Sequence, residues 1–235
     1  MFLILIAVVL FAALTFAVTM SSRSGDNVND DKVKIAASQI TQSGVDMEAA
    51  MMRLRISRNI DPSLMSFETD RLTAYANPGC PVSENECKVF NPVGGQISYN
   101  IPNPEWLNRA LSAQPSYGDW LYTGTACIPG MGMGNDSSCA GNPDQLELIA
   151  MLPWLTREVC VELNKKLGIA QTADTPPKLS GSGWGASPEY IGTFANGVAL
   201  IDTGNVLFAQ PEGCFEGAGT PPTGSYHYYR VLIQR

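Results

Sequence analysis

Six cysteines are the residues with the clearest chemical potential in the chain: Cys80, Cys87, Cys127, Cys139, Cys160 and Cys214. None forms a Cys-x-x-Cys motif, so a zinc ribbon or a thioredoxin-like redox site lacks its main support. Six cysteines allow 15 pairings. Proximity favours Cys80–Cys87 and Cys127–Cys139, each closing a short loop rich in Gly, Pro and Asn, which leaves Cys160–Cys214 to join a helix to a distant loop. We therefore predict disulfides and an oxidising compartment.

Nucleophilic or acid–base catalysis has little support in the sequence. The chain contains one histidine, His227, flanked by Tyr226 and Tyr228 in a predicted strand. Neither a Gly-x-Ser-x-Gly motif nor a Cys-Gly-x-Cys motif is present to supply a nucleophile. We expect the His227 side chain to lie on the sheet surface, and we predict no enzymatic activity.

Binding sites for metals, phosphates and nucleic acids are equally unsupported. The glycines of residues 130–138, GMGMGNDSS, lack the lysine and the strand–helix context of a phosphate loop. The acidic residues Asp26, Asp30 and Asp31 lack the spacing of a calcium loop. The net charge is −7, and no run of basic residues offers a surface for nucleic acid. We predict no metal and no cofactor, and we expect the four tryptophans, Trp106, Trp120, Trp154 and Trp184, to be buried.

The first element of the chain is a continuous apolar segment. Residues 1–20 contain 18 apolar side chains, and the first charged residue is Arg23. Twenty-two uncharged residues at about 1.5 Å each give a helix of roughly 33 Å, close to the thickness of a bilayer core. No basic residue precedes the apolar run, so we predict that Met1 is a mature N-terminus left by removal of a charged leader. A plain membrane anchor with an atypical start is the alternative.

An amphipathic helix is predicted to follow, with residues 23–60 continuing the apolar helix of residues 1–22. Apolar residues recur at steps of three and four, with Gly44 filling one place in the stripe: Val33, Ala37, Ile40, Met47, Met51 and Leu54. Asn59 and the Asp61-Pro62 pair supply a stop. We expect this helix to need a partner on one face only.

Residues 61–235 are predicted to form a loop-rich α+β head with an antiparallel sheet. Candidate strands lie at residues 96–101, after a Gly-Gly turn, at residues 120–123 and at residues 226–233. Asn196-Gly197 indicates a hairpin. A helix is expected over residues 157–167, capped by Thr156 and ended by Gly168.

An apolar N-terminus that runs into an amphipathic helix, followed by a disulfide-bearing α+β head, resembles the type IV pilin and pseudopilin family. Phe2–Leu14 and the helix after it carry the resemblance, over about the first quarter of the chain. The resemblance implies an assembly helix that includes Met1, Phe2, Leu3, Ile4, Leu5, Ile6, Val9, Leu10, Ala13 and Leu14. Family members usually have a glutamate at the fifth mature position, where this chain has Leu5.

The resemblance implies a structural role in an extracellular filament. The partners would be other copies of the chain in a helical homopolymer, the inner membrane before assembly, the pilus assembly machinery and a prepilin peptidase. The chain would be anchored in the inner membrane with an extracytoplasmic head, and would become part of an extracellular filament. Two alternatives remain: a membrane-anchored periplasmic binding or adhesion module, and a minor pilin or pseudopilin of a secretion system.

The substitution Leu5→Arg tests the assembly helix. We expect it to abolish filament assembly, because it places an unpaired charge among apolar neighbours. Electron microscopy of material sheared from the cell surface measures the outcome, and filaments of normal abundance would refute the assignment.

Overall fold

The computed structural model describes residues 25–80, 84–132, 143–172, 174–181, 189–195 and 197–235. Within these residues the chain forms two α-helices and one sheet of five strands. The elements are α2 (Gly25–Arg58), β1 (Leu121–Cys127), β2 (Glu147–Leu155), α3 (Arg157–Leu167), β3 (Val198–Ala199), β4 (Glu212–Glu216) and β5 (Tyr226–Ile233). The predicted α+β class is confirmed, whereas the predicted apolar helix of residues 1–22 lies outside the described residues.

The sheet has the strand order β3-β1-β2-β5-β4. All neighbouring strands are antiparallel except β1 and β3, which are parallel and pair Ala126 with Val198. Every residue of β2 is buried, as expected for a central strand covered on both faces. The expected antiparallel sheet is therefore correct for four strands and wrong for β3.

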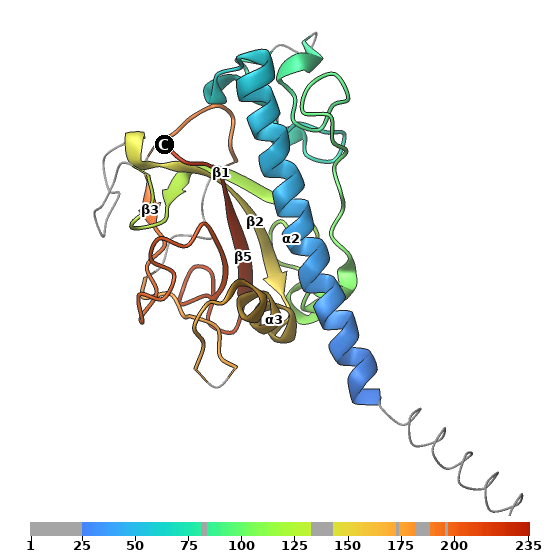
Figure 1. Cartoon of the computed structure of the whole chain (residues 1–235), viewed down its shortest axis with the longest axis vertical. Helices are drawn as coiled ribbons and strands as arrows, with labels where there is room; N and C mark the ends of the chain where they lie inside the picture. The colour runs from blue at the N-terminus through green and yellow to red at the C-terminus, as the bar shows by residue number, and fades with distance from the viewer. Residues whose placement is uncertain (1–24, 81–83, 133–142, 173, 182–188, 196) are drawn as a thin grey trace, which may run out of the picture.

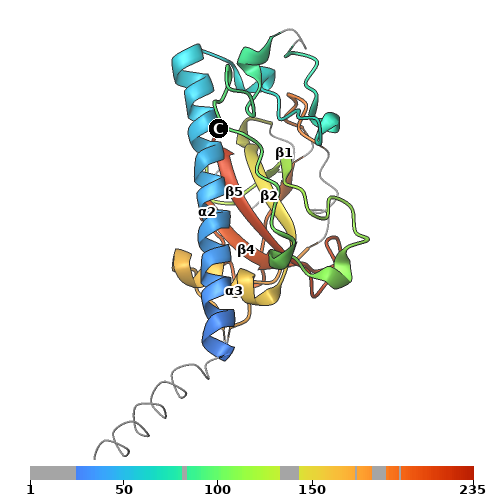
Figure 2. The ribbon, with the colours of Figure 1, turned by 90° about the vertical axis from the view of Figure 1, so that its right-hand side faces the viewer.

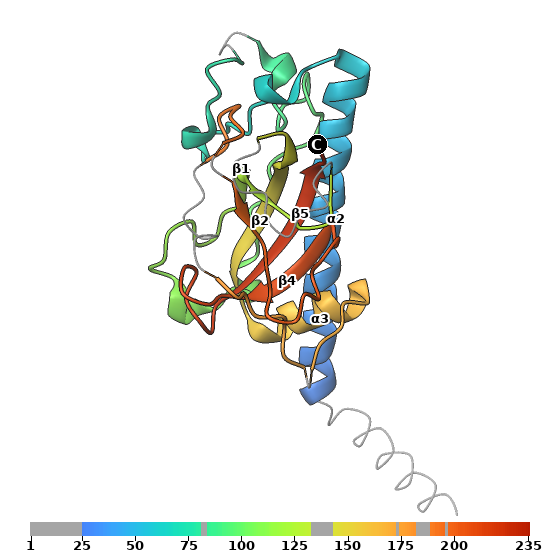
Figure 3. The same ribbon diagram turned by 90° about the vertical axis from the view of Figure 1, so that its left-hand side faces the viewer.

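Helix α2 covers one face of this sheet, as two opposite views show (Figures 2 and 3). Its 34 residues give a length of about 51 Å, longer than the strands it crosses. The predicted apolar stripe packs into the larger core, with Ile40, Met51 and Leu54 fully buried. Across the interface lie Trp120, Tyr122 and Tyr228 from the sheet.

Gly44 allows the closest approach between α2 and the sheet. A Cβ atom at this position would lie 2.7 Å from the hydroxyl of Tyr228 and 2.7 Å from Cδ of Arg230. Such distances are too short for real contacts, so a larger residue would require the side chains of Tyr228 and Arg230, or the helix itself, to shift. The glycine in the middle of the apolar stripe is thus explained by packing.

A buried ionic cluster fastens α2 to β5 and β4. Arg230 on β5 donates hydrogen bonds to Glu48 on α2, at 3.0 and 2.6 Å, and to Glu212 on β4. The other oxygen of Glu212 accepts a 2.7 Å bond from the Tyr228 hydroxyl. Burial by itself lowers the pKa of Arg230, but the hydrogen bond to Glu48 and the charge of Glu212 raise it further, so the net shift is upward. One guanidinium therefore pairs with two carboxylates and joins three elements.

The other face of the sheet carries a second, smaller core. Its central side chains are Ile149, Phe215, Tyr229 and Val231, and loops rather than a helix cover them. The loop over residues 202–207 is held by buried Asp202, whose carboxylate accepts three backbone hydrogen bonds of 3.0 Å from Gly204, Val206 and Leu207. This face is therefore closed by loops whose backbone hydrogen bonds are satisfied locally.

The helix boundaries follow the predicted signals. Asn59 has a φ of 53°, and Asp61 caps the short 3₁₀ helix Pro62–Leu64, so the chain leaves α2 at the predicted stop. Helix α3 spans the predicted residues, with Thr156 accepting a bond from the Val159 amide and Gly168 at a φ of 71°. The helix predictions for α3 and for the described part of α2 are confirmed.

The strand predictions are only partly correct. The strands at residues 120–123 and 226–233 correspond to β1 and β5, but residues 96–101 form no strand. No hairpin is found at Asn196-Gly197 either: Asn196 lies outside the described residues, and β3 pairs with β1 in parallel. Strands β2 and β4 were not predicted at all.

Arg230→Met tests the ionic cluster. The change leaves two carboxylates without their cation, one of them on a buried side chain, so we expect a loss of about 3 kcal/mol in the free energy of unfolding. Arg58→Met is the matched control, because the partner of Arg58 is the exposed Glu86, and it should cost less than about 1 kcal/mol. Urea denaturation of both variants measures the difference, and equal losses would contradict the assignment.

Candidate assembly surface

The outward face of α2 carries a second apolar stripe. It consists of five side chains whose exposed fractions lie between 37 and 80%: Val28, Ile35, Val45, Met52 and Ile56. The spacings are 7, 10, 7 and 4 residues, so at about 100° per residue all five fall within a sector of roughly 120°. This sector lies opposite the face that packs on the sheet. Exposed polar residues lie between them on the same side of the helix, so they form an interrupted row rather than a continuous apolar patch.

The exposed apolar residues of the outward stripe were not part of the expectation that α2 needs a partner on one face only. The prediction assigned the face away from the core to polar residues, and Lys34, Gln42 and Asp46 are indeed exposed there. The apolar residues among them were visible in the sequence. Their spacings of 4, 7 and 10 residues are close to whole numbers of helical turns. This pattern places them on one side of the helix and could have revealed a second face.

The ten predicted assembly-helix residues, Met1, Phe2, Leu3, Ile4, Leu5, Ile6, Val9, Leu10, Ala13 and Leu14, lie outside the described residues. Within the described part of the chain, no helix combines the length and the apolar character that crossing a membrane requires.

Two of the three predicted disulfides are confirmed. Cys80–Cys87 and Cys160–Cys214 are bonded, with Cα–Cα distances of 5.8 and 5.4 Å. Cys127 is also disulfide-bonded, but its predicted partner Cys139 lies outside the described residues, so that pairing stays a prediction.

The Cys160–Cys214 disulfide and two neighbouring hydrogen bonds attach α3 to β4 and orient the helix. The buried amide of Asn164, one turn after Cys160, donates to the carbonyl of Cys214 at 2.8 Å and accepts from its amide at 2.9 Å. Lys166 then reaches from α3 to the Ser38 hydroxyl on α2, at 3.1 Å. Through α3 the sheet thus gains a second attachment to α2, near the lower part of the helix in Figure 1.

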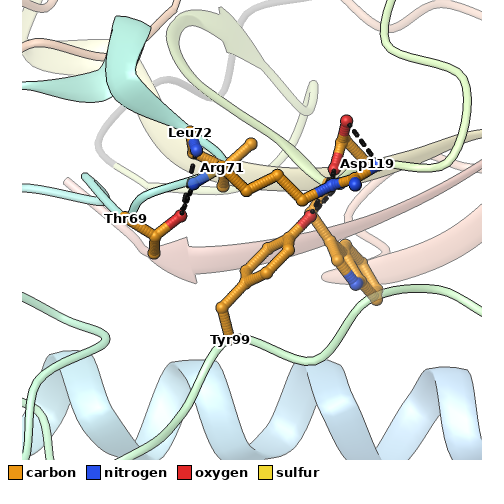
Figure 4. Close-up of polar contacts among 6 residues, drawn as sticks. Thr69, Arg71, Leu72, Tyr99 and Asp119 are labelled. Carbon is orange, nitrogen blue, oxygen red and sulfur yellow. Dashed lines mark hydrogen bonds and ion pairs between the residues drawn. The ribbon is translucent and has the colours of Figure 1, made fainter.

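A polar cluster around Asp119 ties together loops beside β1 (Figure 4). Arg71 forms an ion pair with Asp119, and the Tyr99 hydroxyl donates to the same carboxylate at 3.1 Å. The Tyr99 oxygen in turn accepts the Trp120 amide at 3.0 Å, and burial raises the pKa of Tyr99. Because Asp119 is already paired with a cation, it is a weak candidate for a catalytic base. The cluster instead holds three loops in fixed positions.

The position of His227 contradicts the expectation of a surface side chain. The residue is 2% exposed, and its ring lies between Trp154 and Phe215, with centroid distances of 4.9 and 5.4 Å. Burial lowers the pKa of His227 to about 3, so the imidazole is neutral at physiological pH. Of the four tryptophans, Trp106, Trp120 and Trp154 are buried as predicted, and Trp184 lies outside the described residues.

No group of three or more His, Cys, Asp or Glu side chains in the described ranges is arranged to hold a metal ion. Comparison with protein-family models, with curated proteins and with solved structures gives no match to this chain.

Glu147 is a buried acid at the start of β2. One carboxylate oxygen accepts the Ile128 amide at 3.0 Å, and the other accepts no hydrogen bond from any described residue. Burial raises the pKa of Glu147 to about 7, above its usual value of 4.5. The folded state therefore holds this proton at pH values where the unfolded chain has released it.

This proton makes stability depend on pH in a defined direction. The contribution of Glu147 to the free energy of unfolding is full below about pH 4.5. Up to about 3 kcal/mol of stability is lost as the pH rises through 7. We expect Glu147→Gln to remove most of this loss. Urea unfolding at pH 5 and pH 8 compares the two proteins, and an equal decline in the variant would show that another group is responsible.

Proposed function

We propose that this chain is a structural subunit of a type IV pilus-like extracellular filament and has no enzymatic activity. The observation that carries the proposal is the outward apolar stripe of α2, from Val28 to Ile56. These residues span about 42 Å along the helix. Contacts between subunits would bury these five apolar side chains, which lie on the side of the helix that does not pack in the head.

The sequence that precedes α2 supports the same role. Residues 1–22 are uncharged and almost wholly apolar, and the polar segment of residues 23–27 separates them from Val28, the first residue of the outward stripe. A helix pairs all its backbone groups internally, which makes it stable in lipid and equally stable in a bundle of identical helices. Storage in the inner membrane and packing into a filament core would then use the same surface.

Open filaments require contacts that do not close on themselves. A subunit that offers one side of a long helix to copies displaced along a common axis makes such heterologous contacts. The head would lie on the outside of the filament. There its disulfides reduce the conformational entropy of the unfolded chain, which stabilises the head by about 2–3 kcal/mol for the short Cys80–Cys87 loop and about 4 kcal/mol for the longer Cys160–Cys214 loop.

A membrane-anchored binding or adhesion module is the alternative that uses the same chain differently. In that role residues 1–22 hold a single copy in the membrane, and the outward stripe of α2 makes no contact between copies. A minor pilin or pseudopilin would use the stripe within another filament. In the main proposal this chain is the principal protein of a fibre. As an anchored module, or as a minor pilin or pseudopilin, it would not be.

Val45→Glu tests the stripe, and Ile191→Glu is its matched control. The two side chains are 39 and 42% exposed, but only Val45 belongs to α2. We expect both variants to unfold at temperatures within a few degrees of the original chain, because surface changes cost little. Val45→Glu should lower filament yield at least tenfold, because it buries a charge between helices.

Filament yield is measured by electron microscopy of sheared material, with mass spectrometry to identify the principal protein. Normal filaments from Val45→Glu would overturn the role of the stripe. Loss of filaments in both variants would point to a general defect of the head. A chain found only in membranes, with no fibre in any variant, would favour the anchored module.

A further inference from the structure

A pocket of about 500 Å³ lies on the face of the sheet that α2 does not cover. Its floor is formed by Leu121, Met151 and Pro153 from β1 and β2, and its walls by Trp154 and by the loop that contains Pro221. This volume lies in the range of pockets that bind small molecules. His227 of β5 also lines the pocket.

The hydrogen bonds of Ser225 determine which nitrogen of His227 carries the proton. The Ser225 hydroxyl has one hydrogen, and it donates to the carbonyl of Pro222 at 2.6 Å. The same oxygen lies 2.7 Å from Nε2 of His227, so in this contact the hydroxyl oxygen accepts and Nε2–H donates. The neutral imidazole therefore leaves Nδ1 without a hydrogen, as an acceptor.

Among the described residues, His227 makes its side-chain hydrogen bond through Nε2, to Ser225, and Nδ1 makes none. The indole nitrogen of Trp154, which also lines the pocket, already donates a hydrogen bond to the Pro115 carbonyl at 2.8 Å. Proline nitrogens have no hydrogen to donate. The pocket thus combines apolar ring walls with the Nδ1 acceptor of His227, a residue that is 2% exposed, and its lining also includes the polar residues Gln114, Ser116, Glu189 and Thr220.

We propose that this pocket binds a neutral aromatic compound with a single O–H donor, a phenol, whose hydroxyl donates to Nδ1 of His227. Apolar walls favour a ring without charge, and the exposed carboxylate of Glu189 at the pocket disfavours anions. A phenol satisfies the acceptor and covers apolar surface at the same time. The proposal does not depend on filament assembly.

The chain has one histidine, which makes the test direct. The full chain, labelled with ¹⁵N only at histidine and held in detergent, gives the two imidazole nitrogen signals of His227 alone. We expect p-cresol to shift the Nδ1 signal in the direction of hydrogen-bond acceptance, while Nε2 stays protonated. The ligand control is 4-methylanisole, which has the same ring but no donor, and should bind about five- to tenfold more weakly and leave Nδ1 unshifted.

Two variants distinguish the contribution of Nδ1 of His227 to binding from the contribution of the rest of the pocket. His227→Phe keeps an aromatic ring and removes Nδ1, so its affinities for p-cresol and 4-methylanisole should become equal. Ser225→Ala removes the partner of Nε2, and Ser225 acts here as a positioning residue. A mixture of tautomers in its spectrum, with weaker p-cresol binding, is the expected result.

N-acetyltyrosinamide distinguishes the two sources of a phenol. Binding that equals or exceeds that of p-cresol identifies a tyrosine side chain as the occupant, and binding of p-cresol alone identifies a free small molecule. Three results would overturn the proposal: no change in the His227 signals with any phenol, equal effects of p-cresol and 4-methylanisole, or a spectrum of the unliganded chain with Nδ1 protonated. All three are read from the unmodified chain, so they hold even where a variant fails to fold.

Discussion

The arrangement of the head depends on one cation placed between two anions. Arg230 sits on β5 and pairs with Glu48 of the long helix and with Glu212 of the edge strand β4. A guanidinium buried with one carboxylate carries a large desolvation cost, which a second carboxylate and the Tyr228 hydroxyl offset through further hydrogen bonds. Because the geometry of these bonds is planar and directional, they fix the rotation of α2 about its own axis as well as its distance from the sheet.

That rotation decides which residues of α2 meet solvent. The face that carries Ile40 and Met51 turns to the core, and the opposite face with Ile35 and Ile56 is left outward. Gly44 permits the close contact at the middle of the helix, and α3 holds the helix again through Lys166 and Ser38. The outward stripe is thus presented by a rigid helix with several independent attachments. A surface held in this way is suited to repeated contacts between copies.

Local signals made the helices predictable and left much of the sheet unpredictable. The helix boundaries are set by residues that lie within a few positions of them: Thr156, Gly168 and the Asp61-Pro62 pair. The sequence alone therefore predicts these boundaries. Strand β2 shows no alternation of apolar and polar residues, because both its faces are buried, and it contains Pro153 near a register shift with β5. Strand β4 is short and contains a glycine. The parallel pairing of β3 with β1 depends on contacts far apart in the chain, which no local pattern encodes.

The same limit applies to the candidate sites. Proximity in the sequence was enough to predict the Cys80–Cys87 disulfide. Elimination of the nearer pairs was enough to predict Cys160–Cys214. The burial of His227 could not be predicted, because its covering residues, Trp154 and Phe215, come from two other strands. The second apolar face of α2 could have been recognised, since every residue that defines it lies on one element. What remained hidden in the case of His227 was a contact between distant segments.

The pairing of Glu48 with Arg230 also bears on how the chain reaches its folded state. These residues are 182 positions apart, so α2 emerges from the ribosome long before the strand against which it packs. During that interval the face of α2 that packs on the sheet lacks its partner, which is the condition in which chains aggregate. A nascent chain of this design needs a shield for α2 until β5 arrives, and folding should be governed by the completion of the sheet rather than by the formation of the helix.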